Sequence, residues 1–121
     1  MKIPGPDHPI AIKPAAGRVR VTFNGKVVAD TRRALVLQEA AYKPVFYIPR
    51  EDAQMAAFER TAHATMCPYK GDASYYSIKV GDRVAENAIW SYEAPYPAVA
   101  EIADHLAFYP DRVDAIEATP A

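Results

Sequence analysis

The chain is organised around residues 60–80, RTAHATMCPYKGDASYYSIKV, which we interpret as a loop followed by a strand. This stretch holds the only cysteine of the protein and one of its three histidines. Its second half leads into Gly81-Asp82 and then into RVAENAIWSYE, a further segment rich in strand-forming residues. Two such segments separated by a two-residue turn predict a β-hairpin, and this hairpin decides the fold.

The register of the hairpin sorts its side chains into two kinds. If Gly81-Asp82 is the turn, Val80 lies opposite Arg83 and successive residues alternate between the two faces. The aliphatic face predicts a core and contains Tyr76, Ile78, Ala85 and Ile89. The aromatic face contains Tyr75, Ala88, Trp90 and Tyr92. The aromatic face predicts either a concave binding surface or a second, smaller core under the N-terminal arm.

A second hairpin is predicted nearer the N-terminus. Residues 18–23, RVRVTF, alternate apolar and polar, and Asn24-Gly25 joins them to KVVAD through a type I′ turn. Residues 33–39 predict a third strand or a short helix, and residues 45–48 predict a strand. The proline and acids at 49–52 predict a helical turn near residues 51–57.

The two ends of the chain carry different signals. The prolines of residues 1–17 predict an extended N-terminal arm without hydrogen-bonded structure of its own, in which His8 is solvated. The spacing of Val99, Ile102, Ala103 and Leu106 predicts one helix over residues 98–107, with His105 on its polar side. Residues 106–117 predict one or two final strands.

Chain length and amino-acid composition predict that these elements belong to one domain. A chain of 121 residues predicts a single domain, residues 1–121. Its eleven prolines divide the chain into short elements, and its eight tyrosines suit half-buried sheet faces. We therefore predict a mostly β (α+β) fold of twisted antiparallel sheets of short strands, tent-like or sandwich-like, with one C-terminal helix and a short helical turn.

Net charge and cysteine content indicate which classes of partner and which cellular compartment to expect. The formal net charge is -1 without a block of like charges, so we expect no nucleic-acid partner. No apolar run approaches the ~20 residues of a membrane helix, and the N-terminus lacks a signal-peptide pattern. A single cysteine cannot form an internal disulfide, which favours a cytoplasmic location.

Cys67 is the first candidate for chemistry. A thiol acts as a nucleophile only as thiolate, and Arg60, His63 and Lys70 are cationic neighbours in sequence that can favour that form. The alternatives are a buried small hydrophobe and a metal ligand. His63 and Cys67 supply only two ligands of the three or four that zinc needs, so we predict no metal and no cofactor.

The segments CPYKG (residues 67–71) and WSYE (residues 90–93) supply the other candidates. The hairpin register brings them together, and side chains of mixed charge and aromatic character suit a flat ligand. The predicted ligand-binding residues are Arg50, Arg60, Tyr69, Lys70, Tyr75, Trp90 and Tyr92. The predicted catalytic residues are Cys67, His63 and Glu93. A structural alternative is that these charges pair with one another and hold loops together.

Several runs together resemble a known family. VRVTFNGKVVADT, PVFYIPRED, CPYKG and the WxYExP motif resemble a widespread bacterial and fungal family, the domain of unknown function 427, sometimes labelled a nucleotidyltransferase. The resemblance covers about residues 18–113 and implies a compact β-rich domain. The label implies a metal–nucleotide site with paired acids, whereas the sequence has no DxD pattern.

The leading hypothesis is a domain that binds a small anionic or aromatic ligand around CPYKG and WSYE. One alternative is a protein-interaction or homodimerisation module whose aromatic face docks a partner chain. Another is a nucleotidyltransferase-like enzyme using a divalent metal. The residues do not decide whether the protein is an enzyme.

Overall fold

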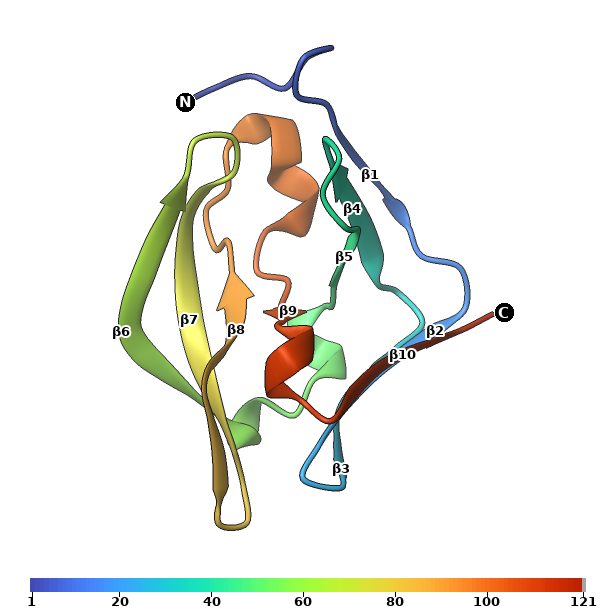
Figure 1. Ribbon diagram of the computed structural model, residues 1–121, viewed down its shortest axis with the longest axis vertical. Coiled ribbons are helices and arrows are strands. Elements are labelled where there is room, and N and C mark those ends of the chain that lie inside the picture. The colour runs from blue at the N-terminus through green and yellow to red at the C-terminus, as the bar shows by residue number, and fades with distance from the viewer. Residues whose placement is uncertain (121) are drawn as a thin grey trace.

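Antiparallel strands dominate the computed structural model, which describes residues 1–120 (Figure 1). They form three sheets, with the strand orders β1-β4-β5, β10-β2-β3 and β6-β7-β8-β9. The strands are β1 (Ile10–Pro14), β2 (Arg18–Phe23), β3 (Lys26–Thr31), β4 (Leu35–Glu39), β5 (Val45–Tyr47), β6 (Phe58–Cys67), β7 (Gly71–Val80), β8 (Arg83–Ser91), β9 (Ala107–Phe108) and β10 (Ala115–Thr119). Four short 3-10 turns, η1 (Arg50–Asp52), η2 (Met55–Ala57), η3 (Pro97–Ile102) and η4 (Pro110–Arg112), are the helical elements. The prediction of a mostly β fold of antiparallel sheets is confirmed.

Two hydrophobic clusters fill the space between the sheets. In Figure 1 the β6-β7-β8 ribbons lie on one side and the two smaller sheets on the other. The first cluster joins Val19 and Val21 of β2 to Ile78 and Ile89 of the long hairpin. The second cluster includes Leu37, Tyr47, Tyr75 and Tyr92. The aromatic face therefore packs inward as a second core, partly covered by Ile10 and Ile12 of the N-terminal arm.

Both predicted hairpins form. Asn24 and Gly25 have φ angles of 49° and 76°, as a type I′ turn requires. In the β7–β8 hairpin, Val80 lies opposite Arg83 as predicted. A bulge then shifts the register between Tyr76 and Ile78, so Tyr75 pairs with Trp90. 

This bulge corrects one residue of the predicted aromatic face. Asn87 adopts a positive φ of 49°, and β8 has two more residues than β7 between the paired positions that flank it. Ala88 consequently lies in the first cluster beside Ile89, rather than with the aromatic residues. Tyr75, Trp90 and Tyr92 keep the predicted face because they follow the bulge in register.

The helix predicted over residues 98–107 is wrong. Val99 has a non-helical conformation inside η3, and Asp104 has a φ of 61°, which a right-handed helix does not allow. The apolar stripe nevertheless marks buried positions, since Val99, Ile102 and Leu106 are fully buried. These residues fill the second and first clusters from an irregular segment whose backbone makes tight local turns and also bonds to Tyr92 and Ile48.

Two further expectations are corrected. The N-terminal arm is extended, but its residues Ile10–Pro14 hydrogen-bond to β4 as strand β1. Residues 60–67, expected as a loop, belong to β6, and they pair with β7 except at residues 61–63, where the register shifts. The predicted helical turn near residues 51–57 is confirmed as η1 and η2. In residues 1–120 no helix is long and apolar enough to cross a membrane.

Candidate functional site

One cavity gathers residues from both sides of the molecule. It has a volume of about 190 Å³, and we call it the tyrosine pocket. Its lining residues are Leu37, Glu39, Tyr42, Lys43, Val45, Tyr47, Lys70, Tyr75, Trp90, Tyr92 and Tyr109. Strands β4 and β5 supply one wall, and the β6–β7 turn with β7 and β8 supplies the other. The cavity therefore exists only when the sheets are packed together.

An ion pair forms the charged wall of the tyrosine pocket. The Lys70 ammonium group pairs with the Glu39 carboxylate, and it also lies 5.8 Å from the centre of the Tyr92 ring. The His8 ring Nε2 hydrogen-bonds the other carboxylate oxygen of Glu39 at 2.7 Å. Burial raises the pKa of Glu39, but the hydrogen bonds from Lys70 and His8 outweigh it and hold this pKa below its ordinary value. The carboxylate is thus charged and well satisfied.

His8 is not the solvated side chain that the sequence predicted. Besides bonding Glu39, its ring stacks on Tyr69, with ring centres 4.0 Å apart and planes 6° apart. Tyr69 itself is half-buried and does not line the pocket. The N-terminal arm is therefore fixed onto the turn that carries Lys70.

Tyrosine hydroxyls form the polar wall. Tyr47 accepts a hydrogen bond from the Trp90 indole nitrogen, with 3.3 Å between the atoms. Tyr75 bonds both Thr65 and Tyr109, at 3.0 and 3.3 Å. Burial raises the pKa of Tyr109 to about 12 and raises the pKa values of Tyr47 and Tyr92 further. Tyr47, Tyr92 and Tyr109 are consequently neutral at physiological pH and can donate or accept a hydrogen bond.

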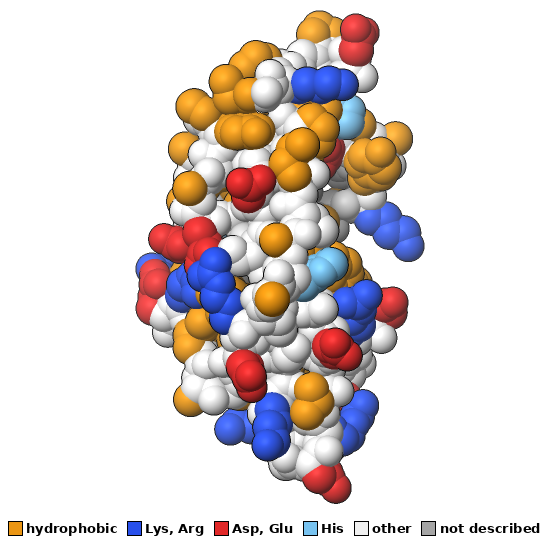
Figure 2. Space-filling view, turned by 90° about the vertical axis from the view of Figure 1, so that its left-hand side faces the viewer, with side chains coloured by type: hydrophobic (Ala, Val, Ile, Leu, Met, Phe, Trp, Pro, Cys, Tyr) orange, Lys and Arg blue, Asp and Glu red, His pale blue; other side chains and the backbone are white. Residues whose placement is uncertain are grey.

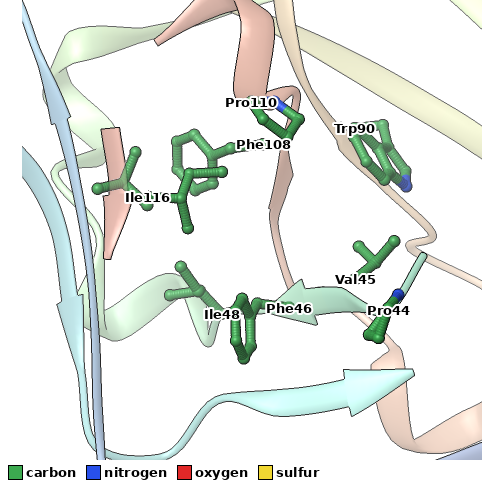
Figure 3. A pocket seen from close by; sticks show the side chains of 9 residues that line it. Pro44, Val45, Phe46, Ile48, Trp90, Phe108, Pro110 and Ile116 are labelled. Atoms are coloured by element: carbon green, nitrogen blue, oxygen red, sulfur yellow. The ribbon is translucent and has the colours of Figure 1, made fainter. Parts of the chain in front are cut away.

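A second cavity lies next to the tyrosine pocket and is lined by apolar residues. We call it the apolar cavity; its volume is about 250 Å³ (Figure 3). Its lining residues are Val21, Pro44, Val45, Phe46, Ile48, Trp90, Phe108, Pro110 and Ile116. Val45 and Trp90 line both cavities. Figure 3 shows these two side chains together along one side of the apolar cavity.

Three of the predicted site residues lie on the opposite face of the β7–β8 hairpin. Glu93 accepts hydrogen bonds from Arg50 and Arg60, each at 3.2 Å, and from Ser74 at 2.8 Å. Arg50 also donates to the Tyr76 hydroxyl at 3.0 Å. We call these five residues the arginine–glutamate cluster. Burial raises the pKa of Glu93, whereas the Ser74 hydrogen bond and the two arginines lower it more, so the pKa stays below its ordinary value.

The residues predicted to share one pocket are therefore divided between the tyrosine pocket and the arginine–glutamate cluster. Side chains of successive strand residues point to opposite faces, so Ser74 and Tyr76 cannot share a pocket with Tyr75. Lys70, Tyr75, Trp90 and Tyr92 line the tyrosine pocket, as expected. Arg50, Arg60 and Glu93 instead bond one another, which is the structural alternative for these charges.

Cys67 and His63 lie four residues apart on β6. In an extended strand that separation is on the order of 10 Å, and no hydrogen bond joins the two side chains in the described chain. His63 meets the Tyr75 ring edge-on at 4.4 Å, whereas Cys67 is half-buried against the second cluster. The structure does not bring them together as a Cys–His pair.

Sequence reasoning missed several pocket residues, namely Glu39, Tyr42, Lys43, Tyr47 and Tyr109. Of these residues, Tyr47 gave the clearest signal in the sequence, because it is the single residue with a polar tip in the apolar run VFYI. Glu39 gave no signal, since an acid at a strand end is ordinary. Within residues 1–120, no group of three or more His, Cys, Asp or Glu side chains is arranged to hold a metal ion.

Comparisons with known proteins give one positive result. A search of curated proteins found no match to this chain. A family model described as a domain of unknown function, DUF427, matches residues 11–119, from β1 to the end of β10. Both walls of the tyrosine pocket fall inside the matched region. This chain is a member of the DUF427 family.

Proposed function

We propose that the protein binds a small, flat ligand with an acidic group in the tyrosine pocket. The observation that carries this proposal is the buried Lys70–Glu39 ion pair in the wall of an aromatic cavity. A buried ion pair contributes little net stability compared with apolar residues of the same size. Its position beside neutral phenols and an indole suits recognition of a polar, planar compound.

Charge favours an acidic group on that ligand. The three charged residues lining the pocket are Lys43, Lys70 and Glu39, which together leave one net positive charge. Lys43 is exposed at the pocket mouth, where it can meet a carboxylate without a large desolvation penalty. The phenols can hydrogen-bond the remaining polar atoms of the ligand.

Binding of benzoate, with benzamide as its neutral counterpart, tests the proposal. Trp90 is the only tryptophan, so its fluorescence reports directly on the pocket, and backbone amide shifts in NMR spectra locate the contact. A fragment of this size is expected to bind with a Kd on the order of 1 mM. Saturable binding of benzoate that is tighter than the binding of benzamide supports the proposal. If benzoate perturbs neither Trp90 nor its neighbours, the proposal is overturned.

A pair of lysine variants separates the pocket from general surface charge. Lys43→Met should weaken benzoate binding severalfold and leave benzamide unchanged, since it removes a charge at the mouth. Lys79→Met is the matched control, because Lys79 is an exposed lysine on β7 outside the pocket. Equal effects of the two variants would contradict a role for Lys43.

A second candidate function is a protein-interaction or homodimerisation module, favoured by the free edge of β6. This ten-residue strand ends the four-stranded sheet, and it faces the viewer in Figure 2. Its residues 62–66 are exposed, and Met66 is 62% exposed. Free strand edges can pair with another chain, whereas the buried aromatic face is not available for docking.

Sedimentation analysis tests this second function. Homodimerisation through β6 predicts a dimer whose formation is abolished by Ala64→Pro, because proline cannot donate to a strand ladder. A monomer at all accessible protein concentrations would overturn the homodimer.

A further inference from the structure

We infer that the ligand of the tyrosine pocket has two parts: an anionic, hydrogen-bonding head in the tyrosine pocket, and an apolar arm that passes Trp90 and Val45 into the apolar cavity. This inference rests on the proposed function and specifies the class of ligand. It is carried by the position and the contrasting chemistry of two adjoining cavities.

Two chain segments, together with Trp90, make the boundary between the cavities. Lys43 lines the tyrosine pocket, Pro44 lines the apolar cavity, and Val45 lines both. In the same way, Tyr109 lines the first cavity and Pro110 the second. Since Val45 and Trp90 each line both cavities, the two spaces adjoin across these side chains.

Trp90 presents a different edge to each cavity. Its indole nitrogen donates to the Tyr47 hydroxyl, which belongs to the tyrosine pocket. The carbocyclic part of the indole lies along the side of the apolar cavity in Figure 3, with Phe108 and Ile116 across from it. Trp90 thus matches the polarity of both sides and can contact both halves of one amphipathic molecule.

The apolar cavity is suited to a hydrocarbon arm. All nine of its lining residues are apolar, and its volume is about 250 Å³. A cavity of roughly 150 Å³ lined by apolar residues accepts benzene, so this one has room for a ring with a short linker. Covering these apolar side chains is favourable because the hydrophobic effect scales with the area removed from water.

A homologous series of acids tests the inference: benzoate, 3-phenylpropionate and 5-phenylpentanoate, each titrated against the full chain by Trp90 fluorescence and amide NMR shifts. Burial of one methylene is worth about fourfold in affinity, so 5-phenylpentanoate should bind at least tenfold more tightly than benzoate. The longer acids should also perturb amides of β10 and η4, which border the apolar cavity and not the tyrosine pocket.

Two variants test whether the gain in affinity of the longer acids comes from the apolar cavity. Ile116→Phe fills the apolar cavity and should remove the gain of the long acid while benzoate binding stays within twofold. Val84→Phe is the matched control, because it adds an aromatic ring at a position that is 59% exposed and outside both cavities. If Ile116→Phe disturbs the fold, Phe46→Ala gives the second readout: it should weaken 5-phenylpentanoate at least fivefold and leave benzoate unchanged.

The outcomes separate the two claims. Benzoate binding with no gain along the series, or a gain that persists in Ile116→Phe, overturns the two-part ligand and leaves the proposed function intact. Failure of all three acids to bind overturns the proposed function, and the two-part ligand with it. A gain that disappears only in the cavity variants establishes the inference.

Discussion

Lys70 and Glu39 form an ion pair in which the two side chains are only 10% and 14% exposed. The same carboxylate accepts a hydrogen bond from His8. One negative charge therefore joins the N-terminal arm, the end of β4 and the turn before β7. The charged wall of the tyrosine pocket and the attachment of the arm depend on the same group.

Removal of the cation should be strongly destabilising. In Lys70→Met the Glu39 carboxylate stays buried without its main partner, and breaking a buried pair typically costs about 3 kcal/mol or more of unfolding free energy. Urea denaturation measures this loss. The exposed Lys79→Met should change the unfolding free energy by no more than ~0.5 kcal/mol. A Lys70→Met/Glu39→Gln double variant should be more stable than Lys70→Met alone, and the opposite order would contradict this account.

Acid should destabilise the fold through Glu93 and Glu39. The folded-state pKa of each lies below its ordinary value of 4.5, so the folded state favours the ionised form. Their stabilising contribution is complete above about pH 4.5 and is lost as the pH falls through the lowered folded-state pKa values. Urea midpoints measured between about pH 6 and pH 3 should therefore decrease towards the acid end. Glu93→Gln should show a shallower decrease, and a parallel curve would show that Glu93 does not contribute.

The residue after Lys70 is constrained by its backbone. Gly71 has a φ of 107°, a conformation that L-residues with a side chain rarely adopt. Gly71→Ala should therefore reduce the unfolding free energy by about 1–3 kcal/mol, even though its Cβ would meet no atom closer than 3.6 Å. Gly5→Ala is the matched control, because Gly5 has open space and no positive φ. Comparable losses in the two variants would argue against a conformational cause.

Local pattern predicted both hairpins because their information is short-range. The alternation of residues 18–23 and the Asn24-Gly25 turn specify each other within a few residues. The bulge at Asn87 could not be predicted, since asparagine in a strand has no signature that distinguishes it from an ordinary polar residue. Its consequence was to move Ala88 to the other face.

The stripe from Val99 to Leu106 predicted burial correctly and secondary structure wrongly. Apolar residues three and four apart are compatible with a helix, but they are equally compatible with an irregular segment held between two sheets. Tertiary hydrogen bonds, such as Asp104 N–H to the Tyr92 carbonyl, replaced those of the helix. The periodicity of apolar residues carries no information about such hydrogen-bond partners.

The candidate site was predicted in part for a similar reason. Hairpin register placed Lys70, Tyr75, Trp90 and Tyr92 around one cavity, because all of them lie on β7 and β8 or directly next to an end of these strands. Arg50 is held by Glu93 through packing between distant elements, which sequence spacing does not encode. The same holds for Glu39 opposite Lys70.

Cys67 should react independently of His63. The imidazole rests against the Tyr75 ring, and the thiol lies four residues along β6 against the second cluster, so His63 is not placed to take the thiol proton. His63→Ala should leave the rate of Cys67 alkylation by iodoacetamide at neutral pH within twofold of the unchanged protein, as followed by mass spectrometry. Glu59→Ala, a substitution at an exposed β6 position, controls for general loosening of the strand. A severalfold drop in rate confined to His63→Ala would restore the Cys–His pair, because only a base acting on the thiol predicts that selectivity.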